Sequence, residues 1–243
     1  MSSSDGKGRT LFEILSGKNK RDMTPLELQY HNPLEAKVGC TISFDHDPDM
    51  EGINFVIEKI SVYETTVDRK KFYHTDYHLR GISLDVDNYI RLRLRVTPDE
   101  NETNTLGCKV QLLHLYDECS WDGDLYGCLN DPLGQFWVNQ DDEGNDLDES
   151  CRRVYWRPEV HNRYIIGPYR ACETVLEDKD GDATITEDEL EHFKVQYWDF
   201  KRTTEDEGGQ QFIEDLCVEM DDEHQNFTFL RGTAIPSQSV FVF

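Results

Sequence analysis

The sequence predicts a mainly β protein with minor helix, built as an antiparallel β-sandwich or a partly open barrel. Two observations carry this prediction. Segments in which apolar and polar residues alternate recur along most of the chain, and a period of two is typical of strands with one buried face. Asp, Gly, Pro and Asn cluster between these segments, as they do in turns. With 243 residues, 37% of them hydrophobic, the chain is long enough to bury a core.

The clearest predicted strand is residues 89–96, Tyr-Ile-Arg-Leu-Arg-Leu-Arg-Val. Its apolar residues fall on one face and its three arginines on the other, which predicts one buried face and one solvated face. A hairpin is expected around Phe136-Trp137-Val138. The other predicted strands are residues 38–45, 53–63, 71–79, 108–116, 152–157, 163–167, 211–220, 226–230 and 239–243.

The charge distribution suggests how the chain is organised. Residues 1–22 are polar and are expected to form a flexible N-terminal arm, followed by a β-rich domain at 23–243. Residues 1–100 carry 14 basic and 17 acidic side chains, whereas residues 101–243 carry 11 and 32. The β-rich domain is therefore either single or divided near 100–106, into a less acidic and a strongly acidic half.

The formal net charge of −24 bears on the partners of the protein. Nucleic-acid binding needs Lys and Arg to replace counterions around phosphates, so an acidic chain argues against it. The same field argues against binding to an anionic membrane surface. A basic protein partner is the expectation that remains, and the acidic half should attract it.

The cysteines and the N-terminus predict a cytoplasmic protein. The first residues contain no apolar stretch typical of a secretory signal, and no apolar run approaches the roughly 20 residues of a membrane helix. The seven cysteines are odd in number and none are spaced C-x-x-C, which favours reduced thiols over a disulfide framework.

Residues 178–189, Asp-Lys-Asp-Gly-Asp-Ala-Thr-Ile-Thr-Glu-Asp-Glu, are the strongest candidate site. Ca²⁺ takes six to eight oxygen ligands in flexible geometry, and alternating carboxylates in a tight loop can converge on one ion. This segment resembles the calcium loop of the EF-hand family, although the family's Gly at position 6 is replaced by Ala183. The resemblance implies that one Ca²⁺ is held by Asp178, Asp180, Asp182, Thr184, Thr186 and Glu189.

The segments around this loop match the family less well. The segment at 168–177 suits a helix or a strand equally, and the one after the loop suits a helix only to about Phe193. No second loop of comparable quality accompanies the first, although EF-hands usually occur in pairs. A structural ion is therefore expected rather than a regulatory sensor, which needs two helices that reopen.

A second constellation is His74, Asp76 and His78, which share one face of the predicted strand 71–79. Two imidazoles and a carboxylate could hold zinc, iron or manganese, and the chain would then be a metal-dependent hydrolase. The other interpretation is a solvated strand face. Arg91, Arg93 and Arg95 form a basic stripe that is expected to find carboxylate partners within the chain.

Three functions follow from these patterns. The first is a non-enzymatic, acidic, β-rich protein in which one calcium ion orders a surface for a protein partner. The second is the metal-dependent hydrolase, for which no nucleophile or cofactor motif gives support. The third is an acidic scaffold, or nucleic-acid mimic, that binds a basic partner without calcium.

Overall fold

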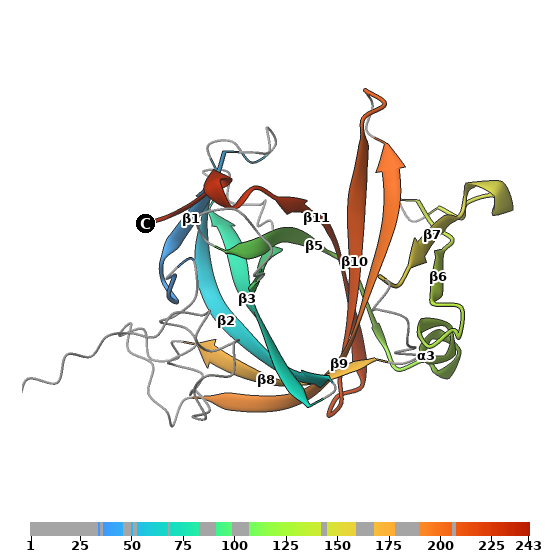
Figure 1. Cartoon of the computed structure of the whole chain (residues 1–243), viewed down its shortest axis with the longest axis horizontal. Helices are drawn as coiled ribbons and strands as arrows, with labels where there is room; N and C mark the ends of the chain where they lie inside the picture. Colours follow the sequence, from blue (N-terminus) through green and yellow to red (C-terminus); the bar gives the residue numbers. More distant parts are fainter. Residues whose placement is uncertain are drawn as a thin grey trace, which may run out of the picture. The chain divides into compact units, whose positions relative to one another are not determined.

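The computed structural model describes residues 34, 36–45, 50, 53–67, 69–82, 91–98, 107–141, 145–158, 168–177, 190–205 and 208–243. These residues are mainly β-strand, with one α-helix and two short 3-10 turns (Figure 1). The elements are β1 Thr41–Phe44, β2 Asn54–Val67, β3 Lys70–Ile82, β4 Arg91–Pro98, β5 Cys108–Ser120, α3 Gly123–Leu129, β6 Gln135–Val138, η1 Glu149–Cys151, β7 Arg153–Trp156, β8 Tyr169–Glu177, β9 Glu191–Glu205, β10 Gln211–Asp221, β11 Asn226–Ile235, η3 Ser237–Ser239 and β12 Val240–Val242.

The strands are hydrogen-bonded in the order β12-β1-β2-β3-β4-β5-β11-β10-β9-β7-β6, and β8 pairs with both β2 and β9. Eight strands thus close on themselves as an antiparallel β-barrel, to which the remaining strands are added. The predicted β-rich class is confirmed in this coarser form, with the barrel in place of a sandwich.

Most predicted strands are present; β2, β3, β5, β10 and β11 run longer than predicted, whereas β1, β7 and β12 are shorter. The segment that suited either helix or strand forms β8, and a second strand, β9, begins at Glu191 where a helical turn was expected. Residues 163–167 lie outside the described part of the chain. The segment Asp122-Gly123-Asp124, whose composition is also typical of a turn, starts helix α3, because the Asp122 side chain accepts hydrogen bonds from the backbone N–H of Asp124 and Leu125.

The chain divides into two compact units. Unit 1 comprises 1–112, 172–192 and 235–243, and unit 2 comprises 113–171 and 193–234. The predicted arm at 1–22 and the predicted division at 100–106 both lie outside the described residues, so both stay predictions.

The core of unit 1 is formed by apolar side chains of β1 to β5, with Tyr77, Leu94 and Ile42 among its fully buried members.

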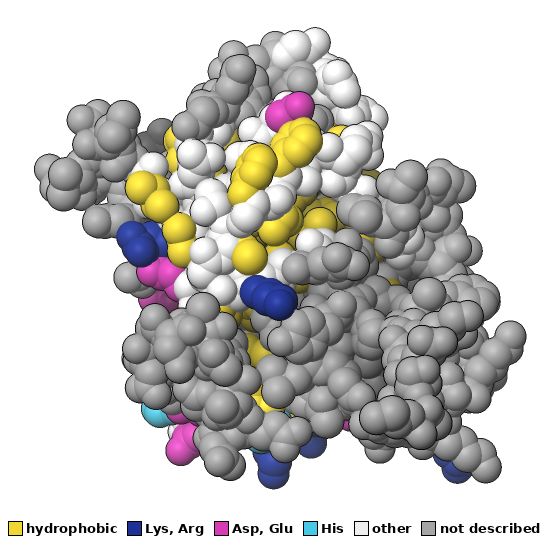
Figure 2. Space-filling model, turned by 90° about the vertical axis from the view of Figure 1, so that its left-hand side faces the viewer, with side chains coloured by type: hydrophobic (Ala, Val, Ile, Leu, Met, Phe, Trp, Pro, Cys, Tyr) yellow, Lys and Arg dark blue, Asp and Glu magenta, His cyan; other side chains and the backbone are white. Residues whose placement is uncertain are grey.

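The side of the protein on which β1 and β2 are drawn in Figure 1 is seen face-on in Figure 2. Hydrophobic side chains gather there, with few charged ones among the described residues.

Strand β2 supplies this core from both halves because it contains a β-bulge. Ile57 pairs with Leu79 and Lys59 with His78, so Glu58 is an extra residue without a partner in the register. The inward positions change from odd to even numbers there: Phe55 and Ile57 precede the bulge and Ile60 and Val62 follow it. Glu58 itself points outward and forms an exposed ion pair with Arg80.

The core of unit 2 is rich in aromatic residues. The buried rings of Phe136, Tyr155, Trp198, Phe200 and Phe227 pack together with aliphatic residues of β10. Helix α3 attaches to this core through Tyr126, whose ring lies edge-on to Trp198 at 5.8 Å between centroids. The predicted hairpin at 136–138 is formed by β6 and β7, which are antiparallel neighbours.

No helix among the described residues has both the length and the apolar composition that crossing a membrane requires.

Candidate functional site

The strands β2, β3 and β4 of unit 1 carry a polar face opposite their apolar one. Residues directly opposite in an antiparallel sheet point to the same side, and the register places Ser61 opposite Asp76, and Asp76 opposite Arg95. His78 lies between Lys59 and Arg93 in the same way. The alternation of the sequence therefore builds one polar cluster from three strands, here called the Asp76 cluster: Lys59, Ser61, Asp76, His78, Arg93 and Arg95.

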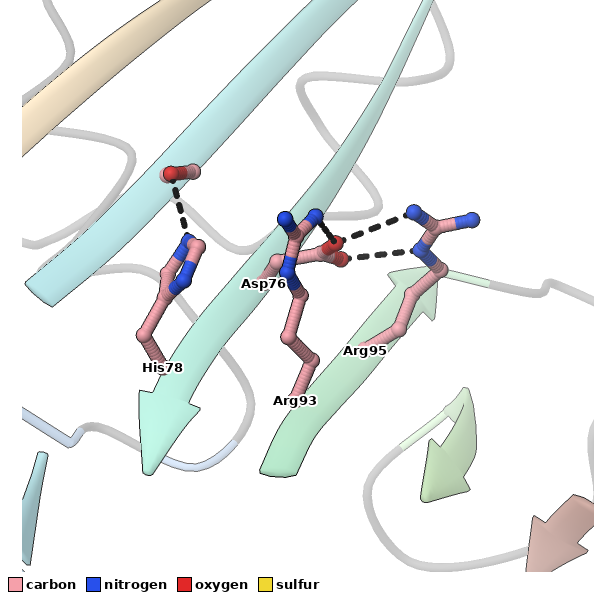
Figure 3. Close-up of polar contacts among 5 residues, drawn as sticks. Asp76, His78, Arg93 and Arg95 are labelled. Carbon is pink, nitrogen blue, oxygen red and sulfur yellow. Dashed lines mark hydrogen bonds and ion pairs between the residues drawn. The ribbon is translucent and has the colours of Figure 1, made fainter. Parts of the chain in front are cut away.

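Asp76 is at the centre of this cluster, and its carboxylate is shared by two guanidinium groups (Figure 3). Nε of Arg95 donates to Oδ1 at 2.8 Å and Nη2 donates to Oδ2 at 3.0 Å. Nη1 of Arg93 lies 3.6 Å from Oδ2. Asp76 is 0% exposed and Arg95 4%. A buried carboxylate is tolerated when charged hydrogen bonds satisfy its oxygens; Arg95 provides two such bonds and Arg93 adds an ion pair.

His78 forms the second contact of the cluster. Its Nε2 shares a hydrogen bond with the Ser61 hydroxyl at 2.8 Å. Burial of the ring lowers the pKa of His78 well below its ordinary value, and the nearby charges of Arg93, Lys59 and Arg95 lower it further. The imidazole is therefore neutral near pH 7, and its tautomer decides whether Nε2 donates a hydrogen bond to the hydroxyl or accepts one from it.

His74, Asp76 and His78 do lie on one face of β3, as predicted, but they have different neighbours. The ring of His74 stacks on Tyr63 with 4.4 Å between centroids, Asp76 binds the arginines, and His78 binds Ser61. The described residues contain no group of three or more His, Cys, Asp or Glu arranged to hold a metal ion. Two guanidinium groups at Asp76 would also repel a divalent cation.

The alternative expectation of a solvated face is wrong, because His74 and Asp76 are buried. The expected intramolecular partners of the basic stripe are confirmed at Arg93 and Arg95, which both bind Asp76. The cluster can thus stabilise the fold and hold a neutral histidine.

Unit 2 contains a second polar cluster that the sequence did not reveal. The Tyr155 hydroxyl donates to Oε1 of Glu214, and Arg202 donates to both carboxylate oxygens of Glu214 at 2.9 and 3.1 Å. The Arg202 guanidinium also lies over the Tyr155 ring, 5.3 Å from its centroid. These residues come from three strands separated by up to 59 positions, so no local spacing signalled their meeting.

The ionisation of this second cluster is set by the same contacts. Burial raises the pKa of Tyr155, and its hydrogen bond to Glu214 raises it further. For Glu214, burial acts to raise the pKa, but the hydrogen bonds from Arg202 and Tyr155 outweigh it and leave the pKa lowered. At neutral pH the cluster thus holds a carboxylate between a neutral phenol and a guanidinium.

The predicted calcium ligands Asp178, Asp180, Asp182, Thr184, Thr186 and Glu189 all lie outside the described residues. The structure does describe the segments on either side. Strand β8 ends at Glu177 and β9 begins at Glu191, and these strands are hydrogen-bonded neighbours. Thr174 Oγ1 and His192 Nδ1 share a hydrogen bond of 3.0 Å across them. The loop is therefore joined to paired strands, where an EF-hand has helices.

Comparison of the chain with family models, curated proteins and solved structures finds no match.

Proposed function

We propose that this chain is a non-enzymatic calcium-binding protein. One Ca²⁺ bound by residues 178–189 orders a surface that a basic protein partner recognises. The observation that carries the proposal is the spacing of oxygen ligands at positions 1, 3, 5, 7, 9 and 12 of that loop.

The strands beside the loop support a structural ion rather than a sensor. Paired β8 and β9 hold the two ends of the loop together, and the Thr174–His192 hydrogen bond ties them further. The paired strands thus already bring the ends of the loop together. This reduces the loss of conformational entropy that accompanies ion binding. Sensor loops act by changing the angle between two helices, and strands offer no such motion.

Charge and cysteine chemistry support the rest of the proposal. The acidic excess of residues 101–243 would attract a basic partner and accelerate its association. No disulfide joins the seven cysteines, and Cys128, Cys151 and Cys172 are exposed. Exposed thiols persist in a reducing compartment, which supports a cytoplasmic location.

The test is calorimetric titration of Ca²⁺ into chelator-treated protein, with Mg²⁺ as the competing ion and thermal melts alongside. We expect one calcium site and a higher Tm in calcium, because an ion that binds only the folded state stabilises it by RT ln(1 + [L]/Kd). At an excess of 100 Kd this amounts to about 2.7 kcal/mol.

The decisive variant is Asp178→Ala with Glu189→Ala, which should abolish both the heat and the shift in Tm. Asp148→Ala with Glu149→Ala removes the same charge from an exposed loop of unit 2 and should leave both unchanged. Equal calcium affinity in wild type and the Asp178/Glu189 variant would refute the proposal.

The two other functions are separated by the same measurements. A hydrolase would require a transition metal at His74, Asp76 and His78, which elemental analysis detects. Its weakness is that both oxygens of Asp76 already bind Arg95. A calcium-independent acidic scaffold would bind basic partners equally well in chelator and in calcium.

A further inference from the structure

The hairpin of β6 and β7 exposes two tryptophans on one face of the sheet. Trp137 is 49% exposed and Trp156 is 50% exposed. In the register Trp137 lies opposite Val154, and Trp156 lies opposite Gln135. The indoles are therefore diagonal neighbours on the same face, with Cα atoms about 7–8 Å apart, within reach of large side chains.

The opposite face of the hairpin is anchored. Phe136 and Tyr155 point into the core of unit 2, where Phe136 packs on Phe200 and Tyr155 binds Glu214. β7 lies between β9 and β6 (Figure 1), and it pairs with β9 through Trp156 and Lys201. The exposed indoles thus stand on a rigid support, which reduces the entropy lost when a ligand contacts them.

The hairpin also ends the sheet. Strand β6 is last in the strand order, and its one strand partner in the described part of the chain is β7. A terminal strand presents backbone N–H and C=O groups to which an extended peptide can add. Leu133, in the turn before β6, is 73% exposed and enlarges the apolar surface next to this edge.

The sequence segment that contains the two tryptophans is acidic. Residues 121–158 contain nine Asp and Glu against three Arg. Arg152 lies 3.7 Å from Glu149, and Arg157 donates to the Leu129 carbonyl oxygen and lies over Phe200. Lys201, opposite Trp156, lies 3.5 Å from Asp215. Positive side chains here are thus engaged within the protein, and the excess charge is acidic.

We propose that the outer face of β6–β7 binds an extended basic segment of a protein partner. Arg or Lys side chains stack on Trp137 and Trp156, since the electron-rich face of an indole attracts cations. The surrounding carboxylates attract the remaining positive charge, and the free edge of β6 aligns the peptide backbone. The proposal shares with the proposed function only the basic protein partner, and it places that partner on a surface that does not depend on calcium binding.

In the experiment, a decapeptide of alternating Arg and Val is titrated into the full chain in the presence of chelator. Binding is measured by tryptophan fluorescence and by calorimetry. We expect saturable binding at one site and about tenfold loss of affinity when Trp137→Ala and Trp156→Ala are combined. A Gln/Val peptide should bind at least tenfold more weakly than the Arg/Val peptide. Trp137→Phe with Trp156→Phe keeps aromatic faces and should retain part of the affinity.

The matched control is Phe72→Ala, which removes an equally exposed ring (49%) from β3 in unit 1 and should leave the affinity unchanged. Equal affinity of wild type and the double Trp→Ala variant, when both have the same circular dichroism and Tm, would overturn the proposal, because the acidic field alone would then explain the binding. Sedimentation showing a dimer that the Trp substitutions dissociate would assign the face to a second copy instead, and would also overturn it. Binding in chelator with no calcium site would refute the calcium proposal and leave this one standing.

Discussion

Asp76 and Arg95 lie directly opposite each other on β3 and β4, and two parallel hydrogen bonds of 2.8 and 3.0 Å join their side chains. Both residues are almost completely buried. A bidentate pair in this position fixes the register of two strands as well as neutralising charge, since a slip by one residue would move the two groups to opposite faces.

Replacing Asp76 with Asn should therefore be strongly destabilising. The substitution leaves Arg93 and Arg95 without their carboxylate, and breaking a buried ion pair costs about 3–5 kcal/mol. Urea unfolding measures the change. Glu58→Gln serves as the control because the Glu58–Arg80 pair is exposed, and we expect it to cost under about 1 kcal/mol. Similar losses in the two variants would contradict this interpretation of the Asp76 cluster.

The lowered pKa of His78 predicts a loss of stability in acid. The unfolded chain takes up a proton near the ordinary pKa of 6.5, whereas the folded chain does so only at a much lower pH. The contribution of this group is therefore present above pH 6.5 and decreases as the pH falls below it. Denaturant unfolding at pH 7.5, 6.5 and 5.5 should give a flatter profile for His78→Gln than for wild type.

His224 provides a control of opposite sign. It is exposed, and its contact with Asp221 raises its pKa. Its contribution is thus present below pH 6.5 and disappears as the pH rises through the folded pKa. His224→Gln should make the loss of stability in acid steeper, where His78→Gln makes it shallower. The same direction of change in both variants would be inconsistent with these assignments.

Two buried tyrosines should respond differently to loss of the hydroxyl. Tyr155 donates to Glu214, so Tyr155→Phe removes a hydrogen bond to a charged group and should cost about 1.5–3 kcal/mol. The Tyr77 hydroxyl has no hydrogen-bond partner among the described residues. Tyr77→Phe should therefore be neutral or stabilising by up to about 1 kcal/mol. Thermal and urea unfolding of the pair would reveal the contrast, which a loss of equal size at both positions would disprove.

Replacing Ala183, at position 6 of the proposed calcium loop, with Gly should raise the affinity of the loop for Ca²⁺. The EF-hand family has Gly there, and a Cβ at positive φ costs about 1 kcal/mol. Ala183→Gly should thus tighten Ca²⁺ binding by about fivefold in a calorimetric titration. Ala171→Gly on β8, outside the loop, tests whether a new glycine acts by local flexibility alone and should not tighten binding. Weaker binding by Ala183→Gly would argue against an EF-hand-like loop geometry.

The strands were predictable because alternation reports which positions share a face. Leu92, Leu94 and Val96 alternate with arginines, and all three are buried in the core of unit 1. Helix α3 was missed because Asp122, its N-cap, is equally typical of a turn, and seven residues are too few to show helical periodicity.

The two polar clusters show which features of the site a sequence pattern cannot predict. Alternation placed Asp76 and His78 on one face, but it could not show that this face is buried, because burial depends on strands far away in the sequence. The partners of Asp76 were suggested by the basic stripe of the neighbouring strand. Those of Tyr155 were not, since Arg202 and Glu214 meet it only through the order of strands in the sheet.

The bulge at Glu58 has a consequence for how β2 tolerates insertions and deletions. Removing this one residue would leave a regular strand, in which Phe55, Ile57, Ile60 and Val62 alternate on the same inward face. Removing one residue elsewhere in the strand would instead turn the residues on one side of the deletion to the opposite face. A lost codon at the exposed Glu58 should thus be tolerated better than a lost codon at another position of β2.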